Sequence, residues 1–299
     1  MPDQPSFGLA TPPQQVGYSD ILRIWQEADA IPEIEHAWLF DHLMPIAGDP
    51  DGPIFEGWTL LSALAAQTER LRLGLLVTSN RFRPPAMLAK IATTVDIVSG
   101  GRLVFGIGAG SRPGLPMARR EYEAHGLPYH DFQHSVAALG EALTVIERLW
   151  RENAPFEFHG SYIDLTGAYG NPKPLQHPHP PILVAGRSAA VLRVAAEHAD
   201  LWNIAVGSSV SSGVNHTAAR PRSATSGAAS DPSDFPMTTG AAPVAAVTSS
   251  TAVSTWEATC WRCCLKSRPS ANSHVTACTC PPRRCTASLA YISSGPSAP

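Results

Sequence analysis

The sequence predicts an α/β protein of the (β/α)8 TIM-barrel class, incomplete at its C-terminal end, with about six β/α units and an irregular tail. Short apolar runs alternate with helical patterns along residues 1–206, which is typical of a parallel sheet covered by helices. Polar and glycine-rich residues follow the second to fifth expected strands, as at the active-site end of such a barrel. The turn after the first expected strand, Thr11-Pro-Pro-Gln-Gln15, lacks the glycines of a doubly wound dinucleotide-binding fold.

Local patterns predict each element. Ser19 is a typical N-cap before apolar positions that share one helix face, and Pro84 suits the first turn of a helix that Ser99-Gly-Gly101 ends. Residues 108–130 form a polar excursion rich in Gly and Pro. The expected strands are 7–10, 37–40, 72–77, 103–107, 182–185 and 200–205, the expected helices are 20–28, 56–67, 84–98, 135–150 and 189–198, and a small hairpin is expected at 156–165.

The composition changes abruptly near residues 205–207. In residues 207–299, Ser, Thr, Ala and Pro make up 54 of 93 positions, whereas Leu, Ile, Val and Phe together number 10, too few for a packed core. This segment holds all six cysteines, and no strand or helix is legible in it. We therefore expect two regions, a barrel domain at 1–206 and a low-complexity tail at 207–299.

Charge and hydropathy exclude several functions. The formal net charge of -3 leaves no basic field for nucleic acid, and no apolar run approaches the roughly 20 residues of a membrane helix. The first 15 residues have no basic stretch followed by an apolar one. We expect a cytoplasmic protein that acts on a small molecule and binds neither nucleic acid nor membrane.

A set of motifs resembles the luciferase-like family of flavin and deazaflavin oxidoreductases. The motifs occur in the family's order over about 200 residues: Trp38-Leu-Phe-Asp-His42, Thr68-Glu-Arg-Leu-Arg-Leu-Gly74, Ser99-Gly-Gly-Arg-Leu103, Phe105-Gly-Ile-Gly-Ala-Gly110, Pro181-Ile-Leu-Val-Ala-Gly186 and Ala199-Asp-Leu-Trp-Asn203. The chain looks most like the branch that uses coenzyme F420, a 5-deazaflavin. The resemblance implies a barrel enzyme that transfers a hydride between this cofactor and an organic substrate, and it also implies a possible homodimer.

The resemblance implies roles for Asp41 and His42. In relatives that oxidise sugar phosphates, the histidine matching His42 accepts the substrate proton, which suits an imidazole that titrates near working pH. Contact with the cofactor ring and a purely structural Asp-His pair are the other two interpretations. Those relatives carry a glutamate close to Ala109, and this chain does not. We therefore expect the histidine-carboxylate couple to be incomplete and sugar-phosphate oxidation to be in doubt.

Three further segments match cofactor-contact regions of the family. Thr78, Ser79 and Asn80 match a strained peptide that presses on the cofactor ring, or form an ordinary polar turn. Gly108, Ala109 and Gly110 end a strand whose glycines either admit a ligand or relieve crowding inside the barrel. Gly186, Arg187 and Ser188 precede a helix and suit a phosphate, or Ser188 is simply its N-cap. A basic cluster of Arg81, Arg83, Arg112, Arg119 and Arg120 is a weaker candidate for the acidic tail of the deazaflavin.

The tail has two interpretations. Its composition is typical of a GC-rich gene read in the wrong frame, so we expect a frameshift near codons 205–208 that removes the last two barrel strands and leaves the first and sixth strands with open edges. The rival is a zinc-binding extension, which the spacing of Cys260, Cys263, Cys278 and Cys280 fits poorly. No metal site is expected elsewhere.

The predicted function is hydride transfer between coenzyme F420 and an unknown organic substrate. The alternatives are an FMN-dependent monooxygenase of the same family, whose cofactor differs at one ring atom, and an inactive truncated barrel.

Overall fold

Six parallel strand positions form most of a curled sheet in the computed structural model, which describes residues 6–111, 116–205, 215–219 and 288–293. The parallel strands are β1 (Ser6–Ala10), β2 (Ile34–Leu39), β3 (Arg72–Leu75), β4 (Thr78–Ser79), β5 (Leu103–Gly108), β8 (Ile182–Ala185) and β9 (Leu201–Ala205). β3 and β4 follow each other at one position, since both pair with β5. The predicted α/β class and the six β/α positions are confirmed.

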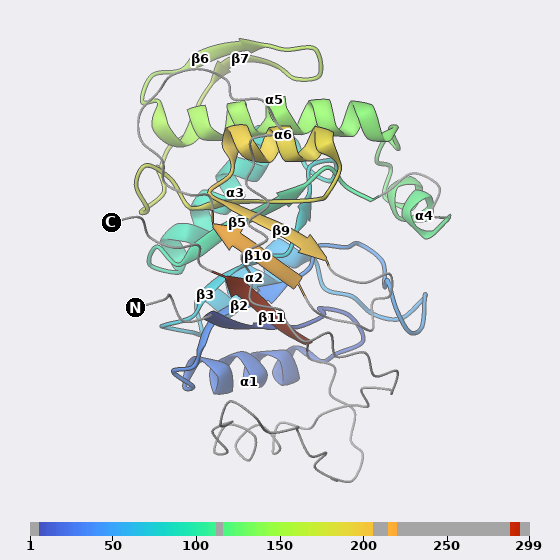
Figure 1. The fold of residues 1–299 in the computed structure, drawn as a ribbon, viewed down its shortest axis with the longest axis vertical. Coiled ribbons are helices and arrows are strands. Elements are labelled where there is room, and N and C mark those ends of the chain that lie inside the picture. The colour runs from blue at the N-terminus through green and yellow to red at the C-terminus, as the bar shows by residue number, and fades with distance from the viewer. Residues whose placement is uncertain (1–5, 112–115, 206–214, 220–287, 294–299) are drawn as a thin grey trace, which may run out of the picture. The chain divides into compact units, whose positions relative to one another are not determined.

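Two strands from the tail fill the gap between β9 and β1. β10 (Asn215–Ala219) runs antiparallel to β9, β11 (Ser288–Ser293) runs antiparallel to β1, and the two are parallel to each other (Figure 1). The predictions that the first and sixth strands keep open edges and that the tail holds no strand are therefore wrong. Edge strands carry unpaired N–H and C=O groups, and here β10 and β11 supply partners for them. Their reversed direction distinguishes both from the last strands of a regular (β/α)8 barrel.

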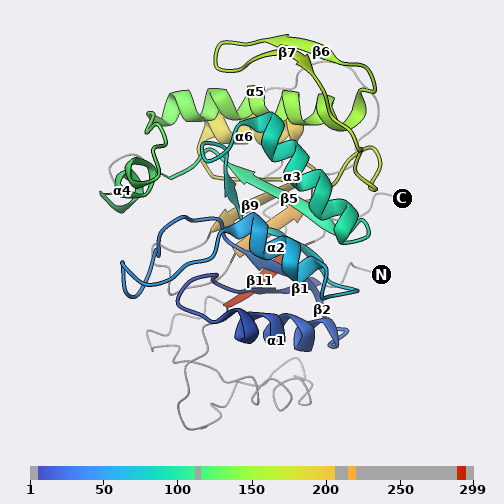
Figure 2. The ribbon, with the colours of Figure 1, turned by 180° about the vertical axis from the view of Figure 1, so that it is seen from behind.

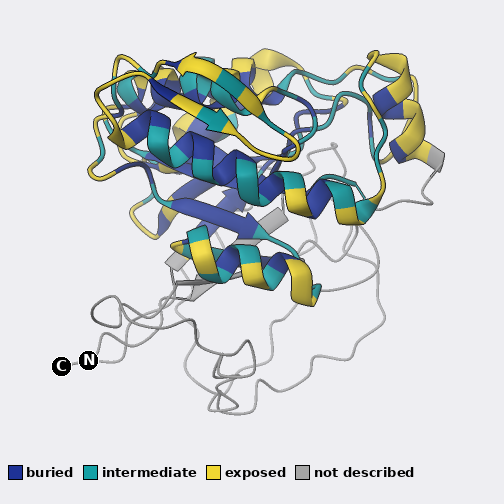
Figure 3. Ribbon diagram, turned by 90° about the horizontal axis from the view of Figure 1, so that it is seen from above, coloured by how far each residue is buried: buried dark blue, intermediate teal, exposed yellow. Residues whose placement is uncertain are grey.

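Helices cover the sheet on its outer side. α5 (Phe132–Arg151) and α6 (Ala189–His198) lie on one side, α1 (Tyr18–Asp29) lies on the opposite side (Figure 1), and α2 (Gly57–Ala65) and α3 (Pro85–Val98) are seen from behind (Figure 2). The hairpin of β6 (Phe156–His159) and β7 (Asp164–Ala168) lies beyond α5. Buried and exposed residues alternate along the helices, which is typical of amphipathic helices on a sheet (Figure 3).

Side-chain caps begin three of these helices. Asp131 accepts a hydrogen bond from the His134 N–H at 2.8 Å, Glu56 accepts one from the Thr59 N–H at 2.6 Å, and Ser188 accepts one from the Val191 N–H at 3.3 Å. The excursion 108–130 contains a helix that we did not predict, α4 (Pro116–Ala124). This helix carries two residues of the candidate site.

Inside the barrel, large side chains fill the space beside glycines of neighbouring strands. Trp38 is buried against Val104 and Leu183, and the opposite position on β3 is Gly74. His36 lies on the same face of β2 as Trp38, and a Cβ at Gly8 would overlap its ring. The Trp38 indole N–H donates to His36 Nδ1 at 2.6 Å. Burial, with the charge of Arg72 as a smaller contribution, lowers the pKa of His36 to about 4, so the imidazole is neutral in the folded protein.

Candidate active site

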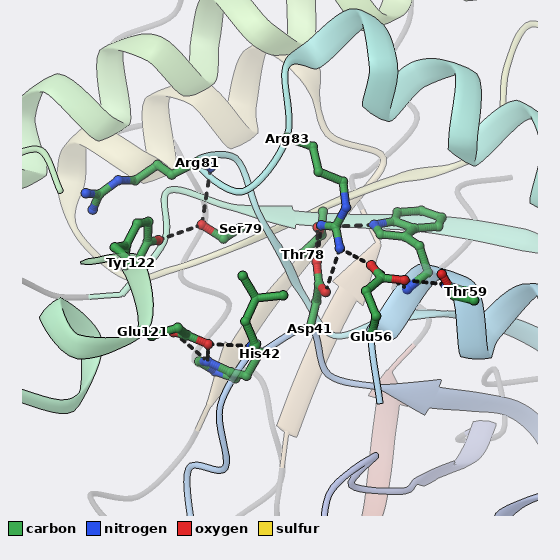
Figure 4. A network of polar contacts seen from close by, with 12 residues as sticks. Asp41, His42, Glu56, Thr59, Thr78, Ser79, Arg81, Arg83, Glu121 and Tyr122 are labelled. Carbon is green, nitrogen blue, oxygen red and sulfur yellow. Dashed lines mark hydrogen bonds and ion pairs between the residues drawn. The ribbon is translucent and has the colours of Figure 1, made fainter. Parts of the chain in front are cut away.

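Asp41 and His42 follow β2 directly, and their side chains point in different directions (Figure 4). The carboxylate of Asp41 is fully buried. It accepts hydrogen bonds from Arg83 Nη1 at 2.6 Å, from Arg83 Nη2 at 3.1 Å and from the Thr78 hydroxyl at 2.5 Å. The hydrogen bonds of Asp41 therefore favour a positioning role, in which it fixes the end of β2 against β4.

Arg83 links this carboxylate to the start of α2. Its second guanidinium nitrogen also contacts Glu56, the N-cap of α2, and Thr78 accepts a hydrogen bond from Trp58 Nε1 at 3.2 Å. Burial alone lowers the pKa of Arg83, but the hydrogen bonds and charges of Asp41 and Glu56 outweigh burial and raise it. Burial likewise tends to raise the pKa of Glu56, and hydrogen bonds from Thr59 with the charge of Arg83 lower it overall.

His42 pairs with a carboxylate from the excursion. Its Nδ1 lies 3.0 Å from Glu121 Oε1 and 3.1 Å from Oε2, and the Leu43 N–H donates to Oε1 at 2.6 Å. The Glu121 side chain is 4% exposed, whereas that of His42 is 28% exposed. The ring of Phe40 meets the imidazole edge-on at 5.5 Å. The expectation that the histidine-carboxylate couple is incomplete is therefore wrong, because α4 supplies the carboxylate that the end of β5 lacks.

The neighbouring residue on α4 contacts the end of β4. The Tyr122 hydroxyl lies 2.8 Å from the Ser79 hydroxyl, and the Arg81 backbone N–H donates to Ser79 Oγ at 3.2 Å. The Arg81 guanidinium lies 4.2 Å from the centre of the Tyr122 ring. Burial raises the pKa of Tyr122, so its hydroxyl stays protonated at neutral pH. Adjacent residues of one helix thus hold His42 and Ser79.

Sequence reasoning missed Glu121 and Tyr122 because their partners are 79 and 43 residues away. The one local signal was Pro116 before a run of good helix formers, which is typical of a first helical turn.

The glycines of β5 make room for the protein itself. A Cβ at Gly106 would overlap the Leu75 carbonyl oxygen, and one at Gly108 would lie 3.1 Å from Val77 Cγ2. The space beside these two glycines is therefore filled by the protein, and a ligand contact at Gly108–Gly110 stays a prediction. Ala109 is buried, and Gly108 accepts a hydrogen bond from the Asn80 N–H at 2.9 Å.

The end of β8 lies beside the ends of β5 and β9. The N–H of Gly186, which has φ +148°, donates to the Asn203 carbonyl at 3.1 Å, and its own carbonyl accepts from Trp202 Nε1 at 2.6 Å. Ser188 is the N-cap of α6, and Arg187 is exposed. A phosphate contact at Gly186–Ser188 remains a prediction.

The basic cluster is largely neutralised. Arg83 pairs with Asp41, Arg119 lies 3.0 Å from Glu123, and Arg120 lies 2.7 Å from Asp51. Arg81 is stacked on Tyr122, and Arg112 lies outside the described residues. Three of the described arginines therefore have carboxylate partners, and contact of the cluster with an acidic tail stays a prediction.

Within the described ranges, no group of three or more His, Cys, Asp or Glu side chains is arranged to hold a metal ion. The cysteines of the proposed zinc extension lie outside those ranges. None of the described helices is both long and apolar enough to cross a membrane.

Together, the curled sheet and the polar groups at the carboxyl ends of its parallel strands define a β/α-barrel protein with a candidate site at that rim. The chain belongs to the luciferase-like monooxygenase family, whose family model matches residues 5–274. The resemblance inferred from the motifs is therefore confirmed, and the match extends beyond the expected boundary at residue 206.

Individual relatives cover about half of this chain. Pyrimidine monooxygenase RutA from a Bradyrhizobium species is 36% identical over 163 residues, which are 54% of this chain and 42% of the relative. Phthiodiolone/phenolphthiodiolone dimycocerosates ketoreductase from Mycobacterium kansasii is 34% identical over 150 residues, 50% of this chain and 38% of the relative. An F420-dependent secondary alcohol dehydrogenase shares the fold, with a TM-score of 0.59 and 22% identity over 67% of this chain and 58% of that chain.

Solved structures that share the fold include two F420-dependent enzymes and a riboflavin lyase with modified FMN. The imidazole side of the described rim fits such a hydride carrier. His42 is partly exposed with a fixed carboxylate partner, and the polar ends of β4 and β5 are joined beside it. An imidazole with a carboxylate partner is a group of the type that can accept a proton.

Proposed function

We propose that the protein binds coenzyme F420 across the carboxyl ends of β2, β4, β5 and β8, and transfers a hydride between it and a small organic substrate. The observation that carries this proposal is the pairing of His42 Nδ1 with Glu121, which leaves the opposite ring nitrogen to exchange a proton. The bound deazaflavin supplies the carbon that accepts or gives the hydride. Names of relatives with secondary-alcohol or ketone substrates support an alcohol-carbonyl pair.

Different residues of the protein have different roles in the proposed reaction. Oxidation of a carbinol removes a hydride from carbon and a proton from oxygen, and the His42 imidazole takes that proton. Asp41, held by Arg83, fixes the strand end that carries His42. Ser79, Asn80, Gly108, Ala109 and Gly110 line the proposed ring site beside it, with Thr78 tying β4 to Asp41. Gly186, Arg187 and Ser188 are the proposed phosphate contact, because N–H groups at a helix start favour an anion.

An FMN-dependent monooxygenase is the second candidate. The similarity to a pyrimidine monooxygenase supports it, and the ring systems of the two cofactors are alike. The third candidate is an inactive barrel whose last quarter is replaced by a frameshifted tail, with domains at 1–206 and 207–299. The reversed direction of β10 and β11 favours that candidate.

The decisive experiment titrates the purified full chain separately with F420 and FMN and measures fluorescence. We expect saturable binding of F420 and weaker binding of FMN, followed by F420 reduction with an alcohol or its reoxidation with an enone. Tighter FMN binding with oxygen consumption would establish the monooxygenase. No saturable binding of either cofactor by a cooperatively folded chain would establish the inactive barrel. Intact mass of the native gene product tests the frame directly.

A further inference from the structure

We propose that Glu121 is a positioning residue for His42, and that it holds the imidazole in the tautomer with the proton on Nδ1 and the lone pair on Nε2. The role of this tautomer in catalysis rests on the proposed function, whereas the tautomer itself does not. The inference extends the site to a helix of the excursion between β5 and α5.

The contact geometry defines the tautomer. Both oxygens of the Glu121 carboxylate lie within hydrogen-bond distance of Nδ1, at 3.0 and 3.1 Å. An ionised carboxylate only accepts hydrogen bonds, so a neutral imidazole in this position has to carry its proton on Nδ1. Its Nε2 is then the only ring atom that can accept a proton from a substrate hydroxyl.

The surroundings of Glu121 restrict its movement. Oε1 also accepts a hydrogen bond from the Leu43 N–H at 2.6 Å, so the carboxylate contacts two consecutive residues of the loop after β2. Its side chain is 4% exposed, so few water contacts compete with these hydrogen bonds.

α4 is anchored by the next residue in the chain. Tyr122 is fully buried, bonds Ser79 through its hydroxyl at 2.8 Å, and packs against the ring of Phe82 at 5.1 Å. Arg120 adds an ion pair to Asp51 at 2.7 Å. These contacts fix the backbone of α4 against the end of β4 and the loop between β2 and α2, so the position of Glu121 does not depend on a bound ligand.

The test is ¹⁵N NMR of histidine-labelled protein without cofactor, with the signal of His42 assigned from its loss in His42→Asn. We expect wild type to show a protonated Nδ1 and an unprotonated Nε2. In Glu121→Gln, the single carbonyl oxygen is taken by the Leu43 N–H and the amide NH₂ faces Nδ1, so we expect the proton to move to Nε2. Glu123→Gln, two residues along the same helix and exposed, is the matched control and should retain the wild-type tautomer.

Turnover gives the second readout. If F420 is the cofactor, Glu121→Gln should lower kcat on the order of 100-fold or more, with cofactor affinity unchanged. A wild-type His42 protonated on Nε2, or an unchanged tautomer in folded Glu121→Gln, would overturn the inference. Because the wild-type spectrum requires no cofactor, failure of cofactor binding would refute the proposed function alone.

Discussion

Trp38 of β2 occupies the space that Gly74 of β3 leaves in the barrel interior, where a Cβ at position 74 would lie 2.7 Å from Trp38 Cζ3. The same Cβ would overlap the carbonyl oxygen of Val104, which cannot rotate away. The fit of these two residues therefore restricts which side chains the inner layer of the barrel can hold, and it does so more strictly than the hydrophobic pattern.

We expect Gly74→Ala to lower the free energy of unfolding by about 1–3 kcal/mol or more, because the added methyl overpacks a site bounded by backbone. Gly140→Ala is the matched control. Gly140 lies within α5, and its Cβ would be 4.0 Å from Val194 Cγ2 of α6, so this change should stabilise α5 by about 0.5–1 kcal/mol. Urea denaturation measures both, and equal effects would refute the packing argument.

Burial of His36 makes stability sensitive to acid. Its pKa is about 4 in the folded protein and 6.5 in the reference state, so the unfolded chain binds the extra proton first as the pH falls. The free energy of unfolding that depends on neutral His36 is therefore fully present above pH 6.5. It falls progressively between pH 6.5 and 4, by about 3 kcal/mol in total. His36→Gln should lack this loss relative to wild type. If the free energies of unfolding of the two proteins change equally with pH across that range, the prediction is contradicted.

Removal of Arg83 should be costly, because it leaves the carboxylate of Asp41 buried without a charge partner. We expect Arg83→Met to lower the free energy of unfolding by about 3–5 kcal/mol. Arg23→Met breaks an exposed pair with Glu27 on α1 and should cost about 0–1 kcal/mol. The double variant Asp41→Asn with Arg83→Met should recover part of the loss. Comparable costs for the two arginine variants would show that Asp41 is not held in this way.

Gly110 allows α4 to pack closely against the end of β4. Its φ is +91°, and a Cβ there would lie 2.7 Å from the Tyr122 hydroxyl and 2.8 Å from Ser79 Oγ. Gly110→Ala should therefore separate these hydroxyls and speed hydrogen exchange of the α4 amides, as measured by mass spectrometry. Gly100→Ala, at φ +69° after α3 with nothing within 4 Å of its Cβ, controls for backbone strain and should leave α4 protected.

Local patterns predicted the parallel strands and the flanking helices, because apolar spacing and caps such as Ser188 act within a few residues. The site was predicted less completely. The family resemblance, together with its position after a strand, singled out His42, but its partner Glu121 lies on a helix that no strong local pattern marks. Arg83 was placed in a cationic cluster because sequence alone does not show that Asp41 faces it across 42 residues. The cofactor contacts stay predictions.

The reversed direction of β10 and β11 changes which residues border the rim that carries His42. At the six parallel positions, the rim is reached by residues that complete a strand. At the positions of β10 and β11, the rim is reached by Asn215 and Ser288, the first residues of these strands. They pair with Ala205 and Ala10. A substitution chosen by analogy with the C-terminal end of a strand in a regular eightfold barrel would, in β10 or β11, lie at the opposite end of the barrel.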